Sequence, residues 1–322
     1  MALLEIKNLA KHYTVGGMFQ KKAQVKALED VSFSLEKGEI LSVVGESGCG
    51  KTTLAKLLMQ IEEPNQGSIS FEGKALRSQP QAEVRKKMQM IFQDPYSSIN
   101  ARKKAWKIIA EPLFINTSHP LTKCREITLE VMAKVGLRPE YADRYPHMFS
   151  GGQRQRIGIA RALVTHPEII ICDEPISALD VSIQAQILNL LMDLQRDMGL
   201  SYIFISHDLS VVRFISDKVL VIYLGKVVEV GHKKNIFENP VHPYTKVLLA
   251  STPRIRHGQR KLYSGKGEIP SRINPPKGCP FESRCPFAIE ECRQASPPLQ
   301  EVEGRMVACY RAGESLELPM SN

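Results

Sequence analysis

Aromatic residues and long apolar runs are scarce in this sequence. Aromatic side chains make up 7% of the 322 residues, which argues against a surface that stacks nucleic-acid bases. The longest uninterrupted apolar run, Val219 to Leu224, is far shorter than the roughly 20 residues of a membrane-spanning helix. The first residues also lack the basic start and apolar core of an export signal. We therefore expect a chain of the cytoplasm that binds no nucleic acid.

The composition is otherwise that of a globular protein longer than one average domain, with 43% hydrophobic and 24% charged residues. The net charge of +9 is compatible with a nucleotide or an anionic membrane leaflet as partner, and equally with a solvated basic surface. Eleven of the twenty prolines lie from Pro240 onward, where helical and strand periodicity fades. This change predicts a boundary near residue 232.

Strand-like segments alternate with helical patterns before that boundary, for example at residues 31–35 and 39–44. This order predicts an α/β fold with a mainly parallel sheet. A polar, largely helical stretch interrupts the alternation and predicts an inserted subdomain. The predicted domains are a core at residues 1–95 and 149–232, a helical subdomain at 96–148, and a C-terminal extension at 233–322.

A phosphate-binding loop is predicted where the sequence G-E-S-G-C-G-K-T follows an apolar strand and precedes a helical run. Its backbone amides and the start of the helix would surround phosphate groups, Lys51 would add a mobile positive charge, and the Thr52 hydroxyl would bind Mg²⁺. The residues expected to contact ATP here are Gly45, Ser47, Gly48, Cys49, Gly50, Lys51, Thr52 and Thr53.

Two carboxylates end another buried strand, at Asp173 and Glu174. We expect Asp173 to hold Mg²⁺ through water and Glu174 to polarise the attacking water as general base. Taken alone, the pair would more often be a polar strand end. His207 follows the next strand, at the sheet edge where such folds place site residues. It is predicted to contact the γ-phosphate, although a lone histidine is often structural.

The sequence F-S-G-G-Q-R-Q-R between these motifs resembles the signature of ABC ATPases. That resemblance implies that Ser150, Gly151, Gly152 and Gln153 contact ATP held by a second ATPase subunit. It also implies that Gln93 binds Mg²⁺ and the water, that Asp180 lies in the D-loop, and that Tyr13 stacks on adenine.

The segment from Ile236 to Leu249 resembles the extension of ATPases in bacterial dipeptide and oligopeptide importers, and the chain is most similar to the F-type subunits of dipeptide importers. The resemblance implies an ATPase on the cytoplasmic face of the inner membrane. Its partners would be a related D-type ATPase, two transmembrane permeases and a periplasmic or extracellular substrate-binding protein. Haem, nickel, murein peptides or antimicrobial peptides are alternative cargoes, and a soluble ABC ATPase is a distant alternative.

Four of the seven cysteines gather in the extension: Cys279, Cys285, Cys292 and Cys309. In a reducing cytosol such a cluster indicates a metal site more than disulfides, and four thiolates suit zinc or an iron–sulfur cluster. Their spacing matches neither common template. The family resemblance favours a 4Fe–4S cluster, with Zn²⁺ or unligated thiols as the alternatives.

Overall fold

The computed structural model describes residues 2–16, 23–94, 98–251, 270–273 and 275–319. The chain forms two units, which are described separately. The first unit comprises Met1–Leu3, Leu35–Ile40 and Phe71–Ile205. The second unit comprises Leu4–Ser34, Leu41–Ser70 and Ser206–Asn322. The predicted boundary at residues 95 and 96 lies outside the described residues, and the predicted domain limits stay predictions.

Three parallel strands form the sheet of the first unit. Strands β6 (Met88–Ile91), β7 (Ile169–Asp173) and β8 (Ser201–Ile205) lie side by side in that order. Every residue of β7 and β8 is buried. Such strands read as continuous apolar runs because helices cover both faces of a parallel sheet.

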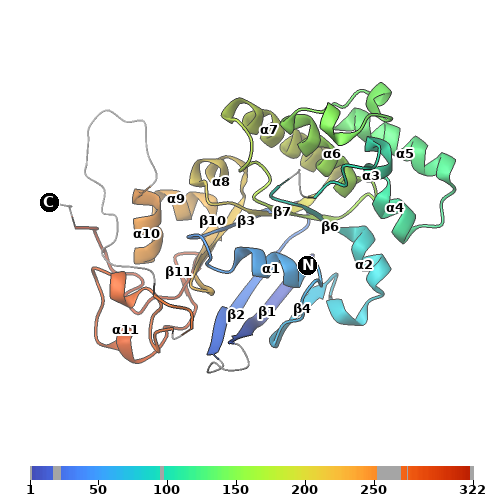
Figure 1. The fold of residues 1–322 in the computed structure, drawn as a ribbon. Helices are drawn as coiled ribbons and strands as arrows, with labels where there is room; N and C mark the ends of the chain where they lie inside the picture. Colours follow the sequence, from blue (N-terminus) through green and yellow to red (C-terminus); the bar gives the residue numbers. More distant parts are fainter. Residues whose placement is uncertain (1, 17–22, 95–97, 252–269, 274, 320–322) are drawn as a thin grey trace. The chain divides into compact units, whose positions relative to one another are not determined.

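Helices make up most of the remaining first unit. They are α2 (Gln81–Lys87), α3 (Ala105–Ile109), α4 (Glu111–Asn116), α5 (Leu121–Lys134), α6 (Gly151–Leu163) and α7 (Val181–Met198). Shorter elements are β5 (Lys74–Ala75) and the 3₁₀ turns Leu76–Ser78, Pro139–Tyr141 and Pro146–Met148. Helices α3, α4 and α5 pack with α6 into one helical group (Figure 1).

Two sheets form the framework of the second unit. In one sheet the order is β11 (Gln300–Val302), β12 (Arg305–Val307), β10 (Lys226–His232), β9 (Lys218–Tyr223) and β3 (Ile40–Val44). Strands β3 and β9 are parallel, whereas the other neighbours are antiparallel. In the other sheet the order is β2 (Ala23–Leu35), β1 (Leu4–Val15) and β4 (Gln66–Phe71).

The helices of the second unit are α1 (Lys51–Leu58), α8 (Leu209–Ile215), α9 (Lys233–Glu238), α10 (Pro243–Ala250) and α11 (Glu291–Gln294), with a 3₁₀ turn at Glu282–Arg284. Helices α9 and α10 pack against β10 (Figure 1). No helix among the described residues is long and apolar enough to cross a membrane.

A buried carboxylate ties the segment after residue 232 to the strand before it. Glu229 of β10 is 0% exposed and accepts hydrogen bonds from the backbone N–H groups of Val241 and His242, both at 3.0 Å. The Arg305 guanidinium of β12 lies 3.6 Å from the same carboxylate. Because an isolated buried charge is costly, these partners fix the start of α10 and the position of β12.

Candidate functional site

The phosphate-loop sequence lies between β3 and α1, the strand–loop–helix context that this motif requires. A Cβ atom on Gly45 would lie 2.1 Å from the Ile222 carbonyl oxygen, so the turn out of β3 accepts only glycine. The Lys51 ammonium donates hydrogen bonds to the carbonyl oxygens of Gly45 (2.8 Å) and Glu46 (3.2 Å). These residues place a buried positive charge beside the N-terminus of α1, an arrangement that suits an anion.

Tyr13 and Cys49, two further residues of the predicted nucleotide site, lie in the second unit. The Tyr13 hydroxyl donates a hydrogen bond to Glu62, and burial raises its pKa, with Thr53 as an additional hydrogen-bond partner. Cys49 is 3% exposed, and burial raises the pKa of its thiol. A neutral buried thiol is a packing residue, not a reactive one.

The predicted base and the predicted Q-loop glutamine meet in the first unit. The Gln93 amide donates a hydrogen bond to a Glu174 carboxylate oxygen at 3.0 Å. Asp173, the last residue of β7, is 5% exposed. The backbone turns sharply after it, since Glu174 has a φ of 46° and its N–H donates to the Ile205 carbonyl oxygen at 3.0 Å. Asp173 is therefore buried at the end of β7, whereas Glu174 lies in the turn that follows and accepts a hydrogen bond from Gln93.

The signature sequence forms the start of α6 in the same unit. Ser150 is the N-cap: its hydroxyl accepts from the Gln153 N–H at 3.3 Å, while the Gln153 side-chain oxygen accepts from the Ser150 N–H at 3.0 Å. A Cβ atom on Gly152 would lie 2.7 Å from the Ile183 side chain of α7. Asp180 occupies the N-cap position of α7 without a side-chain capping bond.

The structure divides the predicted site residues between the two units. The second unit holds the phosphate loop, Tyr13 and His207, an exposed residue between β8 and α8. The first unit holds the carboxylates, Gln93 and the signature turn. The roles of the individual residues stay predictions.

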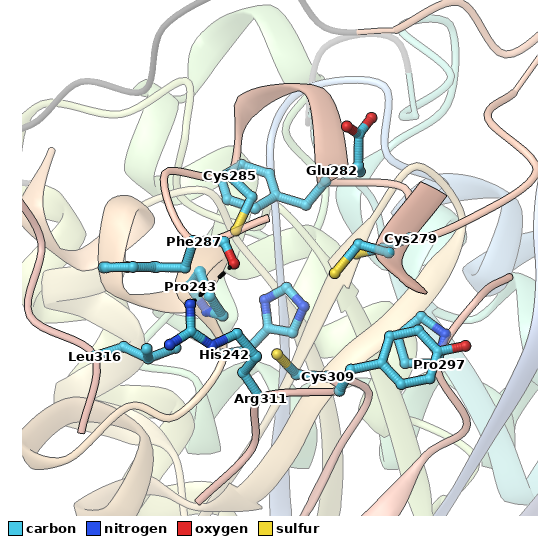
Figure 2. A pocket seen from close by; sticks show the side chains of 13 residues that line it. His242, Pro243, Cys279, Glu282, Cys285, Phe287, Pro297, Cys309, Arg311 and Leu316 are labelled. Carbon is cyan, nitrogen blue, oxygen red and sulfur yellow. Dashed lines mark hydrogen bonds between the residues drawn. The ribbon is translucent and has the colours of Figure 1, made fainter. Parts of the chain in front are cut away.

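The four cysteines of the extension line one small pocket (Figure 2). The sulfur atoms of Cys279, Cys285 and Cys309 are directed into a common space beside the His242 ring. Burial raises the pKa of Cys279 to about 12 and that of Cys285 to about 11. All seven cysteines are free. Among the described residues, no group of three or more His, Cys, Asp or Glu side chains could hold a metal ion, so the predicted metal site is not supported as it stands.

One contact near the phosphate loop was missed from the sequence. The Arg284 guanidinium donates hydrogen bonds to both carboxylate oxygens of Glu46, at 3.1 and 2.9 Å. Glu46 occupies a position of the motif where any residue type is accepted, and its partner lies 238 residues further along the chain. Nothing in the local sequence of either residue indicates the other.

Comparisons with known proteins identify the family. The ABC transporter family matches residues 28–177, and the C-terminal region of oligopeptide/dipeptide transporters matches residues 228–292. The dipeptide transport ATP-binding protein DppF of Haemophilus influenzae is 54% identical over 96% of each chain. This chain belongs to the family of dipeptide and oligopeptide transport ATP-binding proteins. ATP and Mg²⁺ are the ligands expected of such an ABC protein.

Other members and solved ABC structures agree with this assignment. The oligopeptide transport ATP-binding protein OppF of Salmonella typhimurium is 48% identical over 96% of each chain. The solved ATP-binding cassette MJ0796, a dimer bound to ADP and Pi, has a TM-score of 0.62 and 27% identity, covering 71% of this chain and 98% of that one. The predicted fold class is thereby confirmed: an α/β ABC-type nucleotide-binding domain with an inserted helical subdomain and a C-terminal cysteine-containing extension.

Proposed function

We propose that this chain is the ATP-hydrolysing subunit of an ABC importer for dipeptides or short oligopeptides, bound peripherally to the cytoplasmic face of the bacterial inner membrane. The 54% identity over nearly the full length of a dipeptide transport ATP-binding protein carries this proposal. The aligned region covers 96% of this chain and so includes the extension as well as the ATPase core. Cargo choice lies mainly with the permeases and the substrate-binding protein, so haem, nickel or other peptides stay as alternatives.

The residues of the two units have distinct roles in the proposed reaction. Lys51 and the loop amides bind the phosphates of ATP, and Tyr13 stacks on adenine. Thr52, Gln93 and, through water, Asp173 would hold Mg²⁺, which would supply positive charge to the phosphates. Glu174 polarises the attacking water. The Gln93 amide orients the Glu174 carboxylate by the hydrogen bond between them, and His207 contacts the γ-phosphate.

Two ATPase subunits are required for each complete site in this proposal. Ser150, Gly151, Gly152 and Gln153 present a hydroxyl and backbone N–H groups at the start of α6, which can bind the γ-phosphate held by the opposite subunit. Asp180 of the D-loop lies at the start of α7, the helix that Gly152 contacts. A related D-type chain is the proposed companion, and the solved ABC dimers support such an assembly.

Co-purification tests the transporter assignment. A tagged chain, expressed in its native host and recovered from detergent-solubilised membranes, is expected to bring with it two transmembrane subunits and a second ABC ATPase. Mass spectrometry of the recovered complex identifies them. Recovery with nucleic acid or ribosomes, and with no membrane subunit, would contradict the proposal and favour a soluble ABC ATPase.

We also propose that the extension binds a 4Fe–4S cluster through Cys279, Cys285, Cys292 and Cys309. Thiolates are the usual ligands of such clusters, and all four side chains line one pocket. The His242 ring lines the same pocket.

Metal analysis tests the cluster. Anaerobic purification of the full chain is expected to give about four iron and four sulfide per chain, and both values are expected to fall sharply in Cys292→Ser. Cys124→Ser is the matched control, because Cys124 is a buried thiol of α5 in the first unit. Zinc in place of iron and sulfide would overturn the choice of cluster, and the absence of both metals would overturn the metal site.

A further inference from the structure

The turn that carries two of the extension's cysteines contacts the phosphate loop directly. Arg284 is the last residue of the 3₁₀ turn Glu282–Arg284, directly before Cys285. It is 8% exposed, and its guanidinium lies 2.9 Å from the Glu46 carboxylate. The same Nη1 atom donates to the Tyr223 hydroxyl at 3.1 Å. Charge-assisted bonds of this kind, largely shielded from water, are among the stronger side-chain contacts.

The backbone of the same loop residue is held by a second residue beyond position 232. The Glu46 N–H donates a hydrogen bond to the Tyr244 hydroxyl of α10 at 3.0 Å. The Tyr244 ring packs against Tyr223 and Phe281, with centroid distances of 4.5 and 5.4 Å. Glu46 is therefore fixed through its side chain by Arg284 and through its main chain by a packed tyrosine.

Glu46 in turn shapes the part of the loop that contacts phosphate. Its carbonyl oxygen accepts hydrogen bonds from the Lys51 ammonium at 3.2 Å and from the Cys49 N–H at 3.1 Å. A shift of the Glu46 backbone would displace both donors. The position of the lysine charge thus depends on contacts made by the extension.

The conformation of the turn depends on the two cysteines at its ends. The Cys279 N–H donates to the Cys292 carbonyl oxygen at 2.7 Å, the Glu282 N–H to the Cys279 carbonyl oxygen at 3.0 Å, and the Cys285 N–H to the Glu282 carbonyl oxygen at 3.1 Å. Figure 2 shows Cys279, Glu282 and Cys285 around the same pocket. A displacement of either cysteine therefore acts, through these backbone bonds, on a short segment that ends beside Arg284.

We propose that Arg284 is a positioning residue for the phosphate loop, and that the turn Cys279–Cys285 sets the affinity for ATP through the Arg284–Glu46 contact. This inference rests on the proposed function, since it assumes that ATP binds at the loop. A displacement of the turn would then change nucleotide binding without touching the residues that carry out hydrolysis.

Substitution of the ion pair tests the positioning role. In the full chain, Arg284→Gln is expected to raise the ATP dissociation constant and KM about tenfold, the size of one charge-assisted hydrogen bond, while kcat changes less than about twofold. Glu46→Gln is expected to do the same, and the double variant to bind no more weakly than either single variant. Arg284→Lys, which keeps the charge, is expected to recover part of the affinity.

Arg196→Gln is the matched control, because this arginine of α7 is 69% exposed and pairs with Asp193 of the same helix instead of the loop or the turn. Its ATP affinity is expected to stay near that of the unaltered chain. Equal ATP affinity in Arg284→Gln and the unaltered chain would overturn the inference, as would effects of Arg284→Gln and Glu46→Gln that multiply in the double variant. An unaltered chain that binds no ATP would instead overturn the proposed function.

The link to the cysteines has its own measurement. Cys285→Ser is expected to raise the ATP dissociation constant of the unaltered chain several-fold and to add nothing when Arg284 is already glutamine. Fluorescent-nucleotide binding measures both without requiring hydrolysis. Equal effects of Cys285→Ser in the two backgrounds would show that the cysteines act by another route and would overturn this part of the inference.

Discussion

Glu174 lies in a backbone conformation that few residues of its kind adopt. Its φ of 46° falls in the left-handed region, which is uncommon for a residue other than glycine, asparagine or aspartate. Hydrogen bonds on both sides maintain the turn: the Glu174 N–H donates to Ile205, and the Ser177 hydroxyl donates to the Glu174 carbonyl oxygen. Such strained positions gather at functional sites, which agrees with the proposed role of Glu174 as general base.

Glu174→Gln isolates that role. The amide keeps the size of the side chain but removes the charge that polarises water, so ATP hydrolysis is expected to fall by about 10²- to 10⁴-fold. ATP binding and ATP-dependent dimerisation are expected to remain. Phosphate release at saturating ATP measures the first effect, and size-exclusion chromatography with ATP measures the second.

Glu168→Gln is the control for that substitution. Glu168 directly precedes β7, at the opposite end from Glu174, and pairs with the Lys87 ammonium at 2.9 Å. Because partly exposed ion pairs contribute little, hydrolysis by this variant is expected to stay near that of the unaltered chain. Unreduced hydrolysis in Glu174→Gln would exclude Glu174 as the base.

Single residues were predictable where the chemistry is local. The phosphate loop is one continuous motif. Glycine is required at position 45 because a Cβ atom there would collide with the Ile222 carbonyl oxygen. The Gln93–Glu174 bond joins a position that the family resemblance had singled out to one predicted from the end of a buried strand. The Arg284–Glu46 pair was not predictable, because a salt bridge between distant segments depends on how the whole second unit packs.

Helix α6 begins with a reciprocal cap, and its stability depends on that cap. Ser150→Ala removes the acceptor for the Gln153 N–H and is expected to lower the free energy of unfolding by about 1 kcal/mol. Ser150→Thr keeps the hydroxyl and is expected to stay close to the unaltered chain. Urea unfolding followed by circular dichroism compares the three proteins, and an unchanged unfolding midpoint in Ser150→Ala would show that the cap does not contribute in solution.

Long periodic elements were predictable and short strands were not. Helix α7 follows Asp180, with Ile187, Leu191 and Leu194 buried and Gly199 ending it, and this spacing is the apolar stripe typical of an amphipathic helix. Strands β11 and β12 have only three residues each. Their place in the sheet follows from pairing with β10, where Val307 lies opposite Glu229, and no local pattern encodes a partner so far away in the sequence.

The composition of the last third of the chain does not show which of its residues are buried. Its prolines and fading periodicity predicted an irregular extension, yet Tyr244, Phe281 and Cys292 share a buried cluster with Val221 and Tyr223 of β9. The extension therefore supplies part of the core of the second unit. Apolar residues dispersed among prolines form no periodic stripe, so the sequence does not show which of them are buried.

The ion pair between Glu46 and Arg284 also has a consequence for synthesis of the protein. The ribosome makes the phosphate loop first and adds its arginine 238 residues later, which takes roughly 10–50 s at common bacterial translation rates of about 5–20 residues per second. The nascent loop lacks Arg284 throughout that interval, and it lacks Tyr244 until 198 residues have been added after Glu46. A chain interrupted before residue 284 would contain the whole phosphate-loop motif but not the Arg284 contact to Glu46. Full affinity for ATP would therefore be reached only when translation is nearly complete.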